Sequence, residues 1–144
     1  MEETALRLGQ DPVLIDAGGP EDYPAAFARL RVAGVKGLVI TANAWFFRDR
    51  ELLGSLAREA GIVTMCEWGD MALSACAMGY GPVRSDFYDR VADQVARVLQ
   101  GQHPQDMPVE QPTKVELIIN LKSVRAAGAS ISSSLLARAD EVIE

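Results

Sequence analysis

The sequence lacks the features that a membrane span or a nucleic-acid interface requires. No apolar run approaches the roughly 20 residues that cross a bilayer. The chain has 14 basic and 20 acidic residues, a net charge of −6 and no basic cluster. Neither nucleic acid nor an anionic membrane surface is therefore an expected partner, because both select a positive surface. The N-terminus, MEETALRLGQ, has no basic stretch followed by an apolar one, so it lacks the pattern of a secretory signal.

Cysteine and histidine are also scarce. The cysteines are Cys66 and Cys76, and the one histidine is His103. Their spacing matches no metal-ligand motif, so we expect no metal and no cofactor. A disulfide between the cysteines is one alternative, but we expect two small buried thiols. No histidine is placed to activate Cys66, and no Ser-His-Asp set can be assembled, so the sequence favours binding without catalysis.

The first half of the chain alternates between strand and helix patterns. Short apolar runs at 12–17, 35–40 and 62–66 predict strands, and helices are expected after Pro20 and from about 48 to 60. Strand starts recur about every 25 residues with one helix between them, which is the spacing of right-handed βαβ units. The predicted fold class is α/β, a parallel sheet with helices on both faces. Residues 1–9 are expected to be the last turns of a helix.

The second half is less regular. It is predicted to contain an amphipathic helix with an apolar stripe, a semi-rigid linker with three prolines, one more strand and two further helices. The serine run before the last helix is interpreted as a loop and helix cap rather than as a source of a nucleophile. The predicted segments are the helix at 84–100, the linker at 102–113, the strand at 115–121, a short helix near 122–127 and a C-terminal helix, LLARADEVIE.

The region from Tyr80 to the C-terminus resembles a known family. The block P-x-D-x-P-V-E-Q-P-T-K-x-E-L-x-I-N-L-K, the amphipathic helix before it and the ending SLLARADEVIE are similar to the C-terminal part of ABC-transporter substrate-binding proteins of the type I periplasmic class. More narrowly, they resemble a bacterial subgroup that includes binders of aromatic amino acids. The resemblance extends less sharply back to residue 1, where LRLGQDPVLIDAGGPEDYPAAFARL fits the second lobe of the family.

The resemblance implies a two-lobed binding protein of which this chain is the C-terminal portion. Residues 1–78 would be an incomplete second-lobe α/β unit, and residues 79–144 would contain the segments that cross between the lobes. The implied partners are a small organic solute such as an amino acid, bound as the lobes close, and an ABC permease. The implied location is the periplasm, whereas the chain would stay in the cytoplasm if it were complete as written.

A rim of polar and aromatic residues follows the predicted strands, independently of the family. Open parallel sheets bind ligands outside the carboxyl ends of their strands. Two carboxylates, an amide and an aromatic wall suit an organic ligand with an amine and an apolar body. For Trp45 and Phe46 the alternative is packing under a loop, and for Asp16 an ordinary turn. The candidate ligand-binding residues are Asp16, Asn43, Trp45, Phe46, Glu67, Trp68 and, on the crossover, Tyr80.

Two other functions stay open at this point. The chain could be a stand-alone interaction module that forms a homo-oligomer, with a second copy covering the apolar stripe of helix 84–100 where the missing lobe would lie. A weaker alternative is a small α/β enzyme that uses the strand-end rim.

Overall fold

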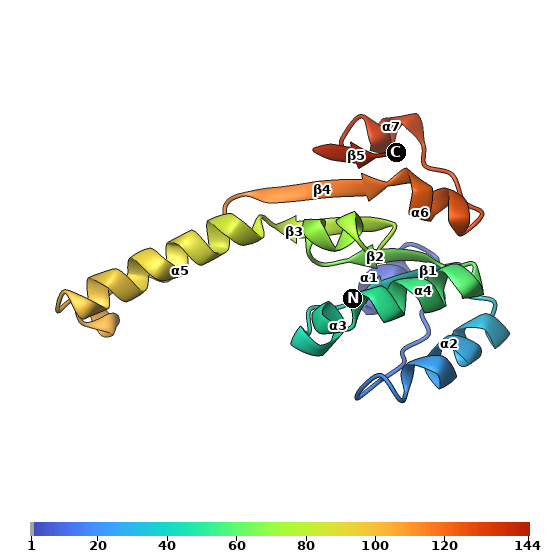
Figure 1. Cartoon of the computed structure of the whole chain (residues 1–144), viewed down its shortest axis with the longest axis horizontal. Helices are drawn as coiled ribbons and strands as arrows, with labels where there is room; N and C mark the ends of the chain where they lie inside the picture. Colours follow the sequence, from blue (N-terminus) through green and yellow to red (C-terminus); the bar gives the residue numbers. More distant parts are fainter. Residues whose placement is uncertain (1) are drawn as a thin grey trace.

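The computed structural model describes residues 2–144, which build one five-stranded sheet (Figure 1). The strands lie in chain order, β1-β2-β3-β4-β5. The pairs β1–β2, β2–β3 and β4–β5 are parallel, and β3–β4 is antiparallel. The predicted α/β class with a mostly parallel sheet is confirmed. The strands are β1 (Gly37–Ile40), β2 (Val63–Cys66), β3 (Met78–Pro82), β4 (Val115–Asn120) and β5 (Glu141–Ile143).

Helices cover both faces of this sheet. On one face, α2 (Tyr23–Val32) and α4 (Arg50–Ala60) enclose a core cluster that includes Ile40 of β1 and Cys66 of β2. On the other face, Ile119 of β4 centres a second cluster with α6 (Leu121–Ala126) and α7 (Ser133–Leu136). Successive strand residues point to opposite faces of the sheet. Ile119 and its partner Met78 therefore lie on the face of the second cluster, whereas Ile118 and its partner Gly79 lie on the other face.

The other helical segments are α1 (Glu2–Arg7), α3 (Ala44–Arg48), α5 (Arg84–Leu99) and the 3₁₀ turns η1 (Gly69–Leu73) and η2 (Pro104–Asp106). Of these, η1 packs against β3 and β4 and contains the buried residues Met71 and Ala72. Figure 1 shows α5 extending away from the body of the molecule, and none of its residues is buried. Over residues 2–144, no helix combines the length and apolarity of a bilayer-spanning segment.

Two secondary-structure predictions are wrong, the strand at 12–17 and the full length of the C-terminal helix. Residues 12–17 form no strand, because no strand lies beside them to share backbone hydrogen bonds, and composition alone does not make a strand. The helix expected from about 48 to 60 is confirmed as α4, and the short helix α3, which was not predicted, precedes it. The C-terminal helix ends early, and β5 replaces its second half. There the carboxylate of Asp140 accepts a hydrogen bond from the Leu117 backbone at 2.7 Å, which aligns β5 beside β4.

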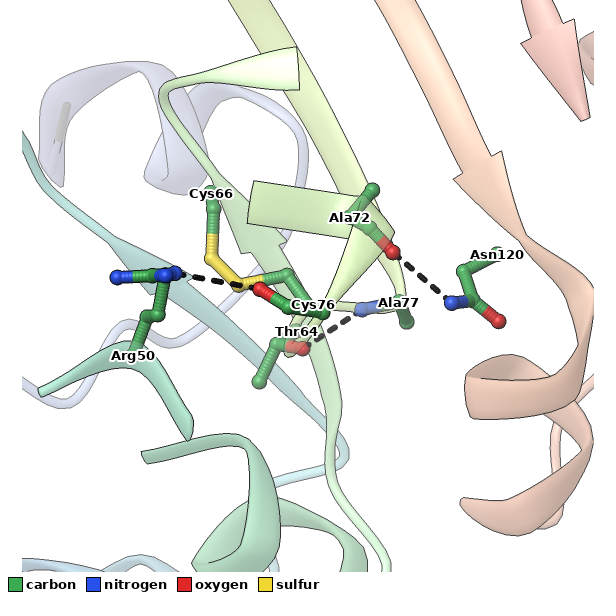
Figure 2. The surroundings of a disulfide bond; sticks show 8 residues. Arg50, Thr64, Cys66, Ala72, Cys76, Ala77 and Asn120 are labelled. Atoms are coloured by element: carbon green, nitrogen blue, oxygen red, sulfur yellow. Dashed lines mark hydrogen bonds between the residues drawn. A yellow bond between two sulfur atoms is a disulfide. The ribbon is translucent and has the colours of Figure 1, made fainter. Parts of the chain in front are cut away.

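The expectation of two free thiols is also wrong, because Cys66 and Cys76 form a disulfide (Figure 2). The 3₁₀ turn η1 reverses the chain after β2 and brings residue 76 back to the end of that strand. Backbone hydrogen bonds from Ala75 and Cys76 to the carbonyl of Met71 stabilise the reversal. The two Cα atoms are 6.2 Å apart, which is within the range that a disulfide spans.

Two buried side chains hold the same segment to the sheet (Figure 2). The hydroxyl oxygen of Thr64 accepts a hydrogen bond of 2.9 Å from the Ala77 backbone. The amide nitrogen of Asn120 donates one of 2.9 Å to the carbonyl of Ala72. Residues 67–77 are therefore fixed between β2 and β4 by one covalent bond and two buried hydrogen bonds.

Candidate functional site

A cavity of about 370 Å³ lies beyond the carboxyl ends of the parallel strands. Its wall begins just after β1, continues just after β2 and ends on the first two turns of α5, which follows β3. This is the position that an open parallel sheet favours for a ligand, and it is where the sequence predicts the site. The cavity is lined by Ala42, Asn43, Ala44, Phe47, Trp68, Arg84 and Tyr88.

Asn43 is placed by the start of α3. Its backbone is extended, and its side-chain oxygen accepts a hydrogen bond of 2.8 Å from the backbone of Trp45, which caps the helix. The cap holds the amide of Asn43 at the cavity wall. It also leaves the nitrogen end of that amide as the part that can donate to a ligand.

Arg84 supplies a positive charge to the cavity. Its guanidinium carbon lies 4.4 Å from the centroid of the Phe47 ring and so makes a cation–π contact. Arg84 also forms a salt bridge with Oδ2 of Asp70. The guanidinium is thus held between an aromatic face and a carboxylate, and its planar fork of donors matches the two oxygens of a ligand carboxylate.

The carboxylates behind Arg84 are partly shielded from water. Within the described chain, Oδ1 of Asp70 is buried and has no hydrogen-bond partner. Burial, and next the negative charge of Asp70, raise the pKa of Glu116, which packs beside Gly69. Removing a carboxylate from water costs free energy, and Arg84 offsets that cost for Asp70 because its guanidinium pairs with the Asp70 carboxylate.

Of the seven predicted site residues, Asn43 and Trp68 line the cavity together. Trp45 lies outside it, 55% exposed, with the guanidinium of Arg48 4.6 Å from its ring centroid. Phe46 points into the core and contacts Tyr23 at a centroid distance of 6.1 Å. For Phe46 the structure therefore matches the packing alternative.

The other three candidates do not line the cavity either. Asp16 is exposed in the irregular segment before α2, and Glu67 is half-buried between Cys66 and Trp68. Tyr80 is 52% exposed and alternates with Gly79 and Gly81, which are buried against residues 67–69. Its side chain therefore points to the opposite face of the sheet. A ligand role for these three residues stays a prediction.

The cavity residues with aromatic or charged side chains that the sequence did not predict are Phe47, Arg84 and Tyr88. The resemblance implied that residues 75–82 cross towards the other lobe, and no strand was predicted there, so the carboxyl end of β3 was not considered. The signal was present: Gly81-Pro82 followed by the start of the strongest amphipathic helix marks a strand-to-helix junction. His103 is exposed in the linker, and residues 2–144 contain no group of three or more potential metal ligands.

Comparison with known proteins identifies a family. The model of the ABC transporter substrate-binding protein family matches residues 29–143. Comparison with curated protein sequences gave no match.

Three solved structures share the fold. A conserved domain protein from Vibrio cholerae is 19% identical with a TM-score of 0.88, and the match covers 98% of this chain and 47% of the Vibrio chain. An ABC domain from Streptococcus pneumoniae in complex with L-Trp is 16% identical with a TM-score of 0.86, and the match covers 99% of this chain and 49% of the Streptococcus chain. The third is the ligand-free, open structure of a substrate-binding protein with adhesive properties from Clostridium difficile. It is 16% identical with a TM-score of 0.65, and the match covers 99% of this chain and 47% of the Clostridium chain. The chain spans about half the length of each.

Proposed function

This chain belongs to the ABC transporter substrate-binding protein family, and on that basis we propose that it contributes one wall of a binding site for a small amino acid-like solute. The observation that carries the proposal is the cavity at the carboxyl ends of β1, β2 and β3, where Arg84 lies among Phe47, Trp68 and Tyr88. A cation beside three aromatic rings suits a ligand with a carboxylate and an apolar or aromatic body. The related Streptococcus structure, which holds L-Trp, supports this choice of ligand class.

In the proposed mode of binding, the guanidinium of Arg84 pairs with the ligand carboxylate while Trp68 and Tyr88 contact its ring. The amide of Asn43 donates to a second polar atom of the ligand. Bound solute shifts a two-lobed protein from an open towards a closed arrangement, because only the closed form contacts the solute from both sides. No chemical step follows, and the role is that of a non-catalytic binder.

Transport is the wider role that we propose, as the solute-binding part of an ABC uptake system delivering its ligand to a permease. The apolar stripe of α5, formed by Phe87, Val91, Val95 and Val98, would then face the other lobe. The disulfide between Cys66 and Cys76 supports a periplasmic location, since disulfides persist in oxidising compartments. Neither the family match nor the related structures favour a self-associating module.

Titration of the chain with L-Trp, followed by two-dimensional amide NMR, tests the proposal. We expect binding in the millimolar range, because one wall of a cleft supplies only part of the contacts, with shifts confined to Asn43, the Trp68 indole and the first turns of α5. Tryptamine, which has the same ring but no carboxylate, should bind more weakly. Absence of any shift with millimolar L-Trp or L-Phe would overturn the proposal.

Two arginine variants of α5 sharpen the test. Arg84→Gln should weaken L-Trp binding at least about tenfold, because a hydrogen bond to a charged group contributes about 1.5–3 kcal/mol and each 1.4 kcal/mol is a factor of about ten. Arg97→Gln is the matched control, because Arg97 lies on the same helix, pairs with Asp93 and does not line the cavity. Equal affinity in both variants would contradict the role of Arg84.

A further inference from the structure

The wall of the cavity beyond β1, β2 and β3 carries one charged side chain, and its charge is positive. Among the residues of 2–144 that line the cavity, Arg84 is that side chain, and no carboxylate is present. Asp16 and Glu67, the carboxylates predicted for this rim, lie outside the cavity. The ammonium group of an amino acid would therefore find no carboxylate on this wall to pair with.

The acidic residues nearest to the lining in the sequence do not change this result. Five of them lie within two positions of a lining residue. Glu67 lies beside Gly81 of β3, and Asp89 is exposed on α5 outside the cavity. The other three already pair with basic side chains. These pairs are Asp49 with Arg48, Asp70 with Arg84, and Asp86 with both Arg90 and Lys114.

Two guanidinium groups lie against the ring of Phe47, which forms part of the cavity wall. The guanidinium carbon of Arg84 is 4.4 Å from the ring centroid, and that of Arg50 is 4.9 Å from it. Arg50 donates hydrogen bonds to the Phe47 carbonyl at 3.1 Å and to the Ser74 hydroxyl at 3.2 Å. Within residues 2–144 no carboxylate pairs with Arg50, whereas Asp70 pairs with Arg84. One of the two positive charges is thus neutralised by a carboxylate, and the other is not.

The polar groups of the wall are mainly hydrogen-bond donors. Arg84 can only donate, and the side-chain oxygen of Asn43 already accepts the hydrogen bond that caps α3, which leaves the amide nitrogen for a ligand. The backbone carbonyls of Asn43, Phe47 and Trp68 each accept a hydrogen bond within the described chain. The hydroxyl of Tyr88 is then the one side-chain acceptor of the lining. Such a wall suits ligand oxygens better than an ammonium group, which brings three donors.

We propose that this wall selects aromatic 2-hydroxy and 2-oxo acids over the corresponding aromatic amino acids. The inference rests on the proposed function, because it takes Arg84 as the partner of the ligand carboxylate. The ammonium of an amino acid is attached to the carbon that bears the carboxylate, so it must lie close to Arg84 and Arg50. There two like charges repel it and no carboxylate compensates. A hydroxyl or keto oxygen in the same place accepts a hydrogen bond from the amide of Asn43.

A matched pair of ligands tests the selection. L-Trp and indole-3-lactate share the indole ring and the carboxylate, and they differ only in an ammonium or a hydroxyl at the same carbon. Titration of the chain with each, followed by two-dimensional amide NMR, should show indole-3-lactate binding about fivefold more tightly at neutral pH. If L-Trp binds as tightly as indole-3-lactate or more tightly, the selection is wrong and the proposed function still holds. Absence of binding by both ligands would overturn the two together.

Variants of Arg50 test the electrostatic cause. Arg50→Gln removes the charge and should reduce the preference for indole-3-lactate over L-Trp to about twofold, whereas Arg50→Lys keeps the charge and should keep the preference. Equal loss of preference in both variants would assign Arg50 a structural role and overturn this cause. Arg58→Gln is the matched control, because Arg58 is exposed on the same helix and does not line the cavity. An unchanged preference in Arg50→Gln would also contradict the proposal.

Discussion

The side-chain amide of Asn120 donates a hydrogen bond of 2.9 Å to the carbonyl oxygen of Ala72, which lies 48 residues earlier in the chain. The same side chain accepts a hydrogen bond of 3.0 Å from the Ser123 backbone and so caps α6. Asn120 is buried at the carboxyl end of β4, and its own backbone donates to Ala77. One residue therefore joins β4, the start of α6 and the segment that leads into β3.

Replacing Asn120 with alanine should lower the free energy of unfolding by about 3 kcal/mol. The substitution leaves the buried carbonyl of Ala72 without its donor and removes the cap of α6, and losses of this kind cost about 1–3 and about 1 kcal/mol respectively. Urea denaturation followed by circular dichroism measures the change. Lys122→Ala, an exposed substitution two residues away, should change stability by less than about 0.5 kcal/mol. A loss below about 1 kcal/mol for Asn120→Ala would contradict this role.

Removal of the disulfide should destabilise the same region. The double variant Cys66→Ala/Cys76→Ala loses a crosslink over a sequence separation of 10, for which a cost of about 2–4 kcal/mol is typical. Dithiothreitol should lower the free energy of unfolding of the wild-type chain by a similar amount and leave that of the double variant unchanged. If the reductant has no effect on the wild-type chain, the two cysteines are not bonded in solution.

Gly81 is required by close packing of two backbones. A Cβ atom at this position would lie 1.8 Å from the carbonyl oxygen of Glu67, so Gly81→Ala must push β3 away from the segment after β2. We expect a loss of about 3 kcal/mol in the free energy of unfolding, at the upper end for overpacked sites. Gly37→Ala is the matched control, because a Cβ at that strand position meets no atom within 4 Å. Equal losses in the two variants would show that strand propensity, and not the contact with Glu67, decides the cost.

The sequence was sufficient where a segment's own pattern decides its structure. Residues 37–40 and 63–66 form strands and α5 forms a helix as predicted, because an apolar run or a long stripe is a local property. Residues 12–17 and 141–143 were mispredicted because a strand also depends on its neighbour. The first segment has no strand beside it, and the second has β4. The site follows the same rule: Asn43 and Trp68 come directly after predicted strands, whereas Arg84 follows β3, whose pairing with β4 only the tertiary structure reveals.

Tyr23 should make stability depend on pH in the alkaline range. Its side chain is 1% exposed, and its hydroxyl donates a hydrogen bond of 2.9 Å to Asp49. Burial, followed by this hydrogen bond, raises the pKa of Tyr23 from 10.0 to about 12. The unfolded chain therefore loses the phenolic proton first, and the stability that Tyr23 contributes is complete below pH 10 and is lost as the pH rises through about 12.

The free energy of unfolding should accordingly fall by about 1–3 kcal/mol over that interval, since each unit of pKa difference corresponds to about 1.4 kcal/mol. Urea titrations at a series of pH values measure the slope. Tyr23→Phe keeps the ring in the core but cannot ionise, so its stability should be lower near neutral pH, where the hydrogen bond to Asp49 is lost, and flatter in the alkaline range. Tyr80→Phe removes an exposed hydroxyl and should keep the wild-type slope. A slope that survives in Tyr23→Phe would assign the alkaline transition to a different group.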